Sequence, residues 1–372
     1  MKKINVVVDG IVYSFQKVGG VSRIFNEIMP RMCEAEEGIY FQLLLNKKNI
    51  QPLPQHKHIF YQNTYKVDPF LRPARLWQPY RTAFKEELII RLMGDSKNKI
   101  WHSTYFTLPK RWKGAVVITA YDMIHERYQE SYFTNLRDEK VRKNKRDAIS
   151  RADQIISISN ATKEDLKNVL GVPDEKIQVI HLACSPVFQK MAGGQRPGKP
   201  YILYVGDRLR YKNFAGLLQA FSMWPKNSEV ELVTVGADWS EEERKSITEL
   251  KLSGKVRLFP FPDDFVLRDL YNQALAFVYP SLYEGFGIPL LEAMSCGCPV
   301  IASRIPSTIE VAEDVPIYHG PGNSEQLLSN LDQAYSEAKS PDRILSGLNR
   351  AKSFSWELTA QKTAELYREL IC

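Results

Sequence analysis

The chain of 372 residues is longer than a single hydrophobic core usually grows, so two domains are expected. Its hydrophobic content of 44% and charged content of 25% are ordinary for a globular protein. No apolar run reaches the ~20 residues that span a bilayer. The first apolar run after the amino terminus is short and meets Asp9, which argues against a signal peptide. Five scattered cysteines exclude a disulfide scaffold and fit a reducing, cytoplasmic setting.

Charge is distributed unevenly along the chain. Residues 1–200 contain 33 Lys and Arg against 20 Asp and Glu, whereas residues 201–372 contain 17 against 23. A basic first half has two explanations that composition does not separate. It contacts an anionic partner, such as a phosphate-linked acceptor or an acidic membrane surface, or it is an ordinary solvated basic surface.

The first half alternates short apolar runs with helical patterns, as parallel α/β proteins do. Strands are expected at residues 3–8, 41–45, 100–103, 115–120, 154–159 and 177–180, and helices at 22–33, 134–151 and 162–170. The charged helix at 134–151 is expected to face solvent. Residues 46–70 have a loop-like composition; His56 and His58 there are either a ligand pair or, as we favour, part of an exposed basic loop.

Two segments of the first half have a composition that suits ligand binding. Gly19-Gly20 follows the first expected strand and precedes a helix with Arg23 in its first turn, an arrangement that presents backbone N–H groups to a phosphate. The polar segment 121–126 follows the strand at 115–120, at the sheet edge where ligands bind in α/β folds. Residues 70–93 mix aromatic and basic side chains, which fits a membrane interface or, as we favour, an amphipathic helix packed on its own domain.

A Gly- and Pro-rich linker at residues 185–200 precedes a second strand and helix series. Strands are expected at 201–205, 229–235, 256–259, 276–279 and 299–302, and helices at 214–221, 265–274, 324–338 and up to about 370. The fold class is therefore α/β, with two doubly wound parallel-sheet domains. The expected ligand site is a cleft between them, facing the carboxyl ends of both sheets.

The segment 279–299, YPSLYEGFGIPLLEAMSCGCP, is the most informative stretch. It places Glu284 and Glu292 eight positions apart, around a Gly285-Phe286-Gly287 elbow that precedes a helical run. The backbone N–H groups of the elbow, together with Arg208 and Lys212, are suited to bind a diphosphate. The two carboxylates are suited to accept hydrogen bonds from sugar hydroxyls. The alternative is ordinary helix capping with surface charges. No Asp-x-Asp pair is present to hold a metal. The close pair Cys296 and Cys298 is expected to be buried near a helix end.

The segment 279–299 closely resembles the E-x7-E signature of the retaining GT-B glycosyltransferases of family GT4. The likeness extends over nearly the whole chain. It includes the Gly19-Gly20-x-x-Arg23 loop and residues 119–126 (TAYDMIHE), 152–166, 204–214 (YVGDRLRYKNF) and the FSW at 354–356. The E-x7-E region and the 204–214 loop are specific, whereas the glycine loop and the FSW are supportive only.

The resemblance implies a role for each matched residue. Arg208 and Lys212 would bind the donor diphosphate, and Glu284 the donor sugar. The backbone of Phe286, Gly287 and Ile288 would help to hold sugar and phosphate. Glu292 would bind the ribose, and the base would lie near Phe261 and Pro262. From the first domain Gly19, Gly20 and Arg23 would approach the phosphate, Asp122 would contact acceptor or donor sugar, and Tyr121 and His125 would lie on the acceptor side.

The resemblance also implies the reaction and its partners. A retaining enzyme of this kind would move a hexose, mannose or another, from a nucleotide sugar such as GDP-mannose or a UDP-sugar to a glycan or lipid-linked acceptor. It would need neither cofactor nor metal and no nucleic acid, and it would work in the cytoplasm, with peripheral membrane contact through the basic half as an option. Expected domains are 1–190 for the acceptor, 191–356 for the donor, and a terminal helix at 357–372 returning to the first domain.

Two departures from the family pattern leave alternatives open. Many relatives have His where this chain has Tyr121, and Gly where it has Pro260. A phenol still forms hydrogen bonds to a sugar, but it is not an imidazole. The alternatives are a nucleotide-sugar epimerase or hydrolase on the same scaffold, and a catalytically weak nucleotide-sugar-binding protein.

Overall fold

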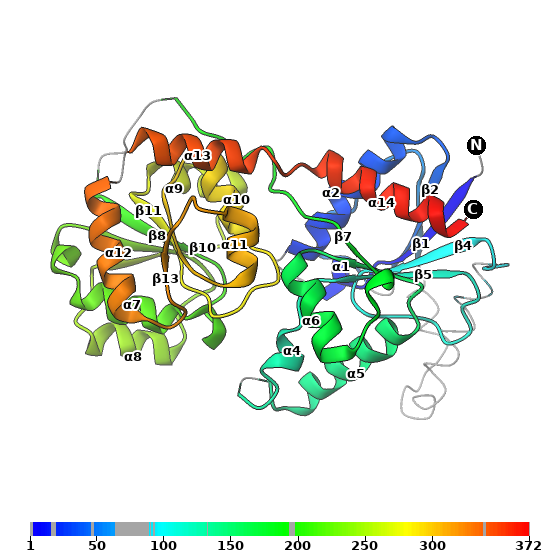
Figure 1. Ribbon diagram of the computed structural model, residues 1–372, viewed down its shortest axis with the longest axis horizontal. Helices are drawn as coiled ribbons and strands as arrows, with labels where there is room; N and C mark the ends of the chain where they lie inside the picture. Colours follow the sequence, from blue (N-terminus) through cyan, green and yellow to red (C-terminus); the bar gives the residue numbers. More distant parts are fainter. Residues whose placement is uncertain are drawn as a thin grey trace. The chain divides into compact units, whose positions relative to one another are not determined.

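The structure is a computed structural model that describes residues 3–15, 20–45, 48–63, 89, 91, 94–131, 133–192, 198–337 and 340–371. It divides into two compact units (Figure 1). The first comprises Met1–Ile158, Thr162–Leu182 and Trp356–Cys372, and the second comprises Ser159–Ala161 and Ala183–Ser355. Gly19 and nearly all of the segment 70–93 lie outside the described residues.

The first unit is built on a sheet of seven parallel strands in the order β3-β2-β1-β4-β5-β6-β7. The strands are β1 (Ile4–Asp9), β2 (Ile39–Leu45), β3 (Ile59–Asn63), β4 (Lys99–Ser103), β5 (Ala115–Ala120), β6 (Gln154–Ser157) and β7 (Ile177–Val179). Central strands such as β5 are buried on both faces, which explains their nearly uninterrupted Val and Ile content.

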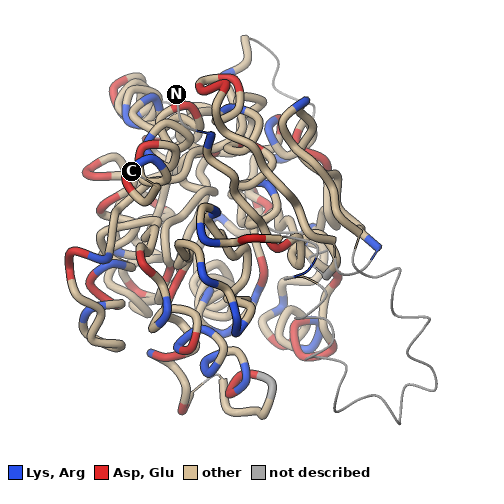
Figure 2. The backbone as a smooth tube through the Cα atoms, turned by 90° about the vertical axis from the view of Figure 1, so that its right-hand side faces the viewer, with Lys and Arg blue, Asp and Glu red and all other residues tan. Residues whose placement is uncertain are grey.

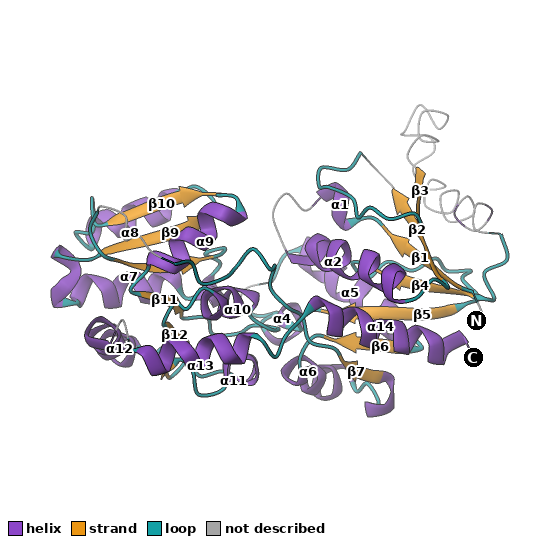
Figure 3. Ribbon diagram, turned by 90° about the horizontal axis from the view of Figure 1, so that it is seen from above, coloured by secondary structure: helices purple, strands orange, loops and turns teal. Residues whose placement is uncertain are grey.

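Helices flank this sheet (Figure 3). They are α1 (Val12–Phe15), α2 (Gly20–Ala35), α4 (Ile124–Arg127), α5 (Leu136–Ser150), α6 (Asn160–Leu170) and α14 (Trp356–Ile371). Helix α2 buries Ile24, Phe25, Ile28 and Met29, the apolar positions that its spacing predicts.

The terminal helix α14 packs beside α2, although more than three hundred residues separate them in sequence (Figures 1 and 3). Arg368 Nε donates to both carboxylate oxygens of Glu36 at 2.9 Å. The buried Tyr367 hydroxyl forms a hydrogen bond with Nδ1 of the buried His102. The carboxyl-terminal helix is therefore an integral part of the first unit.

The second unit contains a sheet of six parallel strands in the order β10-β9-β8-β11-β12-β13. The strands are β8 (Tyr201–Val205), β9 (Glu231–Gly236), β10 (Val256–Pro260), β11 (Ala276–Tyr279), β12 (Val300–Ser303) and β13 (Ile317–His319). The helices are α7 (Phe214–Met223), α8 (Glu241–Glu249), α9 (Asp264–Gln273), α10 (Ile288–Ser295), α11 (Pro306–Ala312), α12 (Ser324–Glu337) and α13 (Pro341–Ala351). The prediction of two parallel-sheet α/β domains is confirmed.

Several elements differ from the sequence prediction. Strand β3 lies where we expected loop, because residues 59–63 pair with β2 at the edge of the sheet and do not show a clear apolar alternation. Helices α11 and α13, which the sequence analysis did not predict, each begin with a proline, a residue that suits the first helical turn. Strand β13 is only three residues long and lacks a detectable period.

Among the described helices, none combines the length and apolar character needed to cross a bilayer. Figure 2 shows acidic residues beside many of the basic ones. Ion pairs such as Lys163–Asp174 at 2.9 Å and Lys143–Asp147 at 3.3 Å use part of the positive charge of the first unit.

Candidate active site

The elbow between β11 and α10 is a tight turn that only glycine accommodates. Gly287 has a φ of 119°, and a Cβ at this position would lie 2.9 Å from Leu290 Cδ1. Pro289 lies in the first turn of α10, where its missing N–H costs nothing. Strand β11 before the turn is entirely buried. The buried strand and the glycine turn therefore fix the position at which α10 presents its first backbone N–H groups.

Lys212 and Glu284 form an ion pair that joins two distant motifs. Lys212 Nζ lies 2.7 Å and 2.8 Å from the two carboxylate oxygens of Glu284. The Lys212 side chain is 19% exposed and that of Glu284 10% exposed. The loops are also tied by their backbones, because Leu282 N–H donates to the Tyr211 carbonyl at 2.7 Å. The structure thus brings together the two residues that the sequence places 72 positions apart.

Buried tyrosines surround this pair. Burial and the neighbouring Glu284 raise the pKa of the Tyr279 phenol well above its usual range, so the phenol stays protonated and forms a hydrogen bond with Glu284. Lys212 Nζ lies 5.9 Å from the centre of the Tyr279 ring and 5.3 Å from that of Tyr211. Burial raises the pKa of Tyr204 as well, with Glu284 adding to the shift and Arg208 opposing it. Tyr204 therefore lies within electrostatic range of both sequence motifs.

Arg208 is held by partners other than Glu284. Its Nε donates to Glu243 at 2.5 Å, and one terminal nitrogen donates to the carbonyls of Ala237 and Asp238 at 2.7 Å and 2.9 Å. The guanidinium carbon lies 4.6 Å from the Trp239 ring centre. The side chain is 5% exposed. Arg208 is therefore rigidly anchored to the start of α8.

One donor atom of Arg208 is left over by this anchoring. Among the described residues, no acceptor lies within hydrogen-bonding reach of the buried Nη1 atom. This atom faces Gly236, since a Cβ there would lie 3.1 Å from it. Burial raises the pKa of Glu243, but hydrogen bonds from Arg208 and Ser240 outweigh this and lower it overall. The carboxylate therefore remains charged and keeps the guanidinium oriented.

Glu292 occupies the second turn of α10 and is only 6% exposed. The Tyr271 hydroxyl, from α9, donates to Glu292 Oε2 at 3.1 Å. Burial, together with Glu292, raises the pKa of Tyr271 well above its usual range. The two glutamates of the E-x7-E motif thus have separate tyrosine partners on the same unit.

The loop after β10 carries an aromatic side chain in a strained conformation. Phe261 has a φ of 45° and is 55% exposed. A bulky residue in the left-handed region costs about 1 kcal/mol or more, so such a conformation commonly marks a functional position. Pro262 follows, and Asp263 caps α9 by accepting the Val266 N–H at 2.9 Å. The loop therefore presents an aromatic ring at the carboxyl end of β10.

In the first unit, the predicted residues of segment 121–126 lie at the carboxyl end of β5. The Tyr121 hydroxyl donates to the Thr104 carbonyl at 3.2 Å, and burial raises the pKa of this phenol well above its usual range. Asp122 Oδ1 accepts the Ile124 N–H at 3.1 Å. The His125 ring lies 4.3 Å from that of Phe133, and burial lowers its pKa. All three have protein partners within the first unit.

The glycine-loop residues fall at the start of α2. Gly20 is the first residue of the helix and is exposed, and Arg23 lies in the first turn with a half-buried side chain. The arrangement of a strand followed by a helix amino terminus is present, as β1 ends at Asp9 and α2 begins at Gly20. Gly19 itself lies outside the described residues.

Two buried charges near segment 121–126 were missed by the sequence analysis. Lys145 is only 2% exposed; its Nζ lies 2.9 Å from Glu126 and 3.0 Å from the Asp122 carbonyl. The expectation that α5 faces solvent is therefore wrong for this face. The helical spacing from Lys145 to the buried Ala148 and Ile149 was the signal for it.

Asp9, at the end of β1, is the second missed residue. Its carboxylate accepts the Ser103 hydroxyl at 2.8 Å and the Thr104 N–H at 2.9 Å. Burial raises the pKa of Asp9 to about 7, although these hydrogen bonds lower it in part. Its position directly after a buried strand was the available signal. Asp9 also raises the pKa of Tyr121, so the two groups are electrostatically coupled.

Comparison with protein families gives two adjacent matches. Residues 18–186 match the family described as "Glycosyltransferase Family 4", and residues 188–346 match "Glycosyl transferases group 1". An Escherichia coli protein, "O-antigen chain mannosyltransferase B", is 29% identical over 94% of this chain and 96% of its own length. The "O-antigen chain mannosyltransferase RfbU" of Salmonella typhimurium is 27% identical over 73% of this chain and 74% of its own length.

Solved structures share the fold at lower sequence identity. A sucrose-phosphate synthase from Thermosynechococcus elongatus superposes with a TM-score of 0.77 at 20% identity, covering 99% of both chains. The glycosyltransferase WaaG, involved in lipopolysaccharide biosynthesis, gives a TM-score of 0.72 at 16% identity, covering 97% of this chain and 99% of its own. The two parallel-sheet units are those of GT-B glycosyltransferases. The chain belongs to glycosyltransferase family 4, the group 1 glycosyl transferases, and is a glycosyltransferase acting on nucleotide sugars.

Proposed function

We propose that this enzyme transfers mannose from a nucleotide-activated mannose, with GDP-mannose as the first candidate, to a growing O-antigen-type glycan. The relative that covers 94% of the chain carries the name of an O-antigen mannosyltransferase, and so does RfbU. A 27% identical relative from Mycolicibacterium hassiacum, covering 59% of the chain, is also named a mannosyltransferase. These names support the choice of mannose over other hexoses.

The Lys212–Glu284 pair carries the assignment of the donor site. A lysine ammonium has three N–H donors, and Glu284 uses two of them. The third serves the donor diphosphate, whose developing negative charge the ammonium stabilises. A carboxylate accepts about four hydrogen bonds, and Lys212 and the Tyr279 phenol supply three of them, so Glu284 retains acceptor capacity for a sugar hydroxyl. The ion pair keeps Glu284 charged and aimed before the donor binds.

Arg208 supplies a second positive charge to the leaving diphosphate. Its anchoring by Glu243 and the carbonyls of Ala237 and Asp238 leaves Nη1 as the atom for a phosphate oxygen. A preoriented donor needs little reorganisation as charge develops, which is the main source of electrostatic catalysis. The backbone N–H groups of Phe286, Gly287 and Ile288 at the start of α10 complete the cradle for sugar and phosphate.

Residues of α10 and of the loop after β10 bind the nucleoside. Glu292 accepts the ribose hydroxyls, a vicinal diol that matches the two oxygens of a carboxylate. The exposed ring of Phe261 stacks on the base, with Pro262 beside it. The left-handed conformation of Phe261 is consistent with a residue whose orientation is maintained for binding.

The first unit supplies the acceptor side. Gly20 and Arg23 offer the amino terminus of α2 and a positive charge to an anionic group of the substrates, and Asp122 contacts the acceptor or the donor sugar. Tyr121 acts only as a hydrogen-bonding group, because its raised pKa keeps it protonated at neutral pH. His125 stays neutral, since burial lowers its pKa. With retention at the anomeric carbon and no protein nucleophile, the departing phosphate takes the acceptor proton on the same face, so catalysis rests on positioning and electrostatics.

A lipid-linked acceptor would bring the enzyme to an anionic membrane surface. The excess of basic residues in positions 1–200 supports this extension of the proposal. Flotation with vesicles containing anionic lipid tests it: binding that weakens with salt supports it, and absence of binding at low salt contradicts it.

The decisive experiment is a donor panel of GDP- and UDP-sugars with and without acceptor glycans. Nucleotide release from GDP-mannose that requires the acceptor supports mannosyl transfer. Free sugar or an epimer formed without acceptor would instead indicate a hydrolase or an epimerase. Tight donor binding without turnover would indicate a nucleotide-sugar-binding protein. Acceptor-dependent turnover of another hexose alone would refute the choice of mannose.

A further inference from the structure

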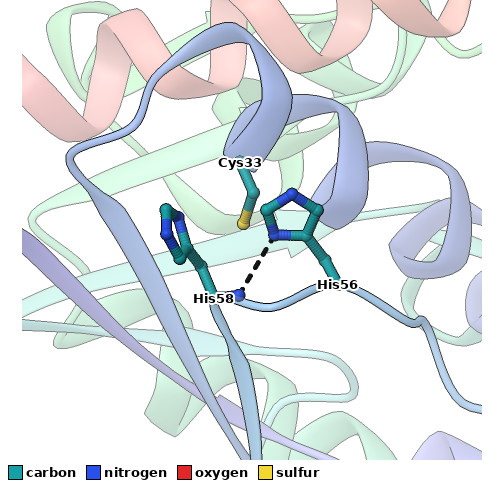
Figure 4. Close-up of side chains that lie close together, drawn as sticks. All are labelled: Cys33, His56 and His58. Carbon is teal, nitrogen blue, oxygen red and sulfur yellow. Dashed lines mark hydrogen bonds between the residues drawn. The ribbon is translucent and has the colours of Figure 1, made fainter.

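A cluster of Cys33, His56 and His58 lies in the first unit, outside the proposed glycosyl-transfer site. One ligand atom from each residue lies within 4.8 Å of the other two. Figure 4 shows the Cys33 sulfur between the two imidazole rings. We propose that these three side chains bind a divalent transition-metal ion of the zinc class.

The chemistry of the three side chains suits such an ion. Thiolate sulfur and imidazole nitrogen are the preferred ligands of Zn²⁺. His58 Nδ1 is buried and has no hydrogen-bond partner among the described residues, which is a costly state for a polar atom. The Cys33 thiol makes only a long contact of 3.8 Å to the Ile39 carbonyl. Both side chains therefore keep electron pairs that a metal ion would use.

The rings are already oriented by their surroundings. The backbone N–H of His58 donates to His56 Nδ1 at 3.1 Å, a bond that gives way if this nitrogen ligates the ion. The His58 ring lies 4.5 Å from that of Tyr40 and 5.2 Å from that of His56. Support of this kind around a ligand reduces the entropy lost when a metal binds.

The separations require only a modest adjustment. Bond lengths of about 2.0 Å to nitrogen and about 2.3 Å to sulfur place tetrahedral zinc ligands roughly 3.3–3.6 Å apart. A set of atoms within 4.8 Å therefore closes by at most about 1.5 Å, which side-chain rotation supplies. Three protein ligands leave a fourth position for water or for a carboxylate. Glu34 is the adjacent candidate, because its charge acts on both Cys33 and His56.

The position of the cluster indicates a structural ion. Cys33 lies near the end of α2 and contacts Ile39, the first residue of β2, while His58 directly precedes β3. The His58 carbonyl accepts the Phe41 N–H at 2.9 Å. The cluster is thus at the amino ends of these strands, whereas Asp122 follows the carboxyl end of β5. A bound ion would connect α2 to the β3 edge of the sheet.

A redox role for Cys33 fits the structure less well. The side chain is 2% exposed. Redox-sensing cysteines are accessible to solvent. The cluster is not apparent from the sequence, because 22 residues separate Cys33 from His56, whereas recognisable zinc motifs contain closely spaced ligand pairs.

Titration of the full-length chain with Co²⁺, followed by competition with Zn²⁺, tests the proposal. We expect one equivalent of Co²⁺ with tetrahedral ligand-field bands and a thiolate-to-cobalt charge-transfer band. Cys33→Ser should abolish the charge-transfer band, and His58→Gln should weaken binding at least about tenfold. Cys184→Ser, which changes a half-buried cysteine in the second unit, is the matched control and should leave the titration unchanged.

Thermal unfolding provides an independent readout. Zn²⁺ at about one hundred times its Kd should raise the Tm of wild type and of Cys184→Ser by roughly 5 °C, and the Tm of His58→Gln by much less. Circular dichroism and turnover with the sugar donor identify variants that have lost their fold. The proposal is overturned if wild type lacks the charge-transfer band at a metal excess, or if folded His58→Gln and wild type take up cobalt with the same affinity and spectrum.

Discussion

Replacement of Lys212 by alanine removes one half of the ion pair on which the donor site depends. Two unit charges at 2.7 Å attract by about 6 kcal/mol at an effective dielectric constant of roughly 20. Desolvation of both groups offsets much of this attraction. Because the side chains are 19% and 10% exposed, we expect a net loss of about 1–3 kcal/mol in the free energy of unfolding.

The catalytic loss should be larger than this loss of stability suggests. Removal of one preoriented group that stabilises developing charge typically lowers kcat by about 10²–10³. The corresponding increase in activation free energy is about 3–4 kcal/mol. The Lys212→Ala enzyme should therefore be folded at 25 °C and still transfer sugar several hundred times more slowly than wild type.

The assay measures nucleotide release from GDP-mannose at saturating acceptor, alongside denaturant unfolding of each variant. Lys163→Ala is the matched control, since Lys163 is 20% exposed and pairs with Asp174 at 2.9 Å in the first unit. Because Asp174 is 60% exposed, this control should leave stability nearly unchanged and keep wild-type turnover. A folded Lys212→Ala enzyme with a near-normal kcat would refute the role assigned to Lys212.

Three further predictions concern buried or strained groups. The folded-state pKa of Asp9, about 7, exceeds the usual 3.8, so its contribution to the free energy of unfolding is complete below pH ~4 and is lost as pH rises through 7. Relative to Asp9→Asn, wild type should therefore lose roughly 4 kcal/mol of stability between about pH 4 and about pH 8, as measured by urea unfolding. A stability difference between the two proteins that stays constant with pH would contradict this. Lys145→Met should lower the free energy of unfolding by about 3–5 kcal/mol, because it leaves Glu126 buried without a counter-ion. Lys143→Ala, which removes one partner of an exposed ion pair, should leave stability nearly unchanged, and chemical denaturation measures both variants. Phe261→Gly should stabilise the fold by about 1 kcal/mol while raising the KM for the donor about tenfold, and an unchanged KM would remove Phe261 from the base site.

Much of the fold follows from local pattern. Strands at 115–120 and 276–279 are short runs of Val, Ile, Ala and aromatic residues, which only a doubly covered parallel sheet buries completely. The elbow at Gly287 is also readable, because proline and glycine there have a single compatible geometry. The edge strand β3 was not readable, since its pairing with β2 depends on the tertiary structure rather than on its own apolar alternation.

The site was predictable in its composition but not in its contacts. The motifs predict Lys212, Arg208 and Glu284 as site residues. They do not predict that Lys212 forms an ion pair with Glu284 and Arg208 with Glu243. These pairings arise where loops from different strands meet at one sheet edge. For the same reason the sequence favours an exposed loop over a ligand pair at His56 and His58, because helix α2 brings Cys33 to them only in the folded chain.

The most direct measurement of the donor-site assignment compares calorimetric affinities of wild type and Glu284→Gln for GDP-mannose and for GDP. If Glu284 binds a hydroxyl of the transferred sugar, its neutral isostere should weaken GDP-mannose binding by about tenfold to a hundredfold and should not weaken GDP binding. Equal losses for both ligands, or no loss for either, would show that Glu284 does not read the sugar.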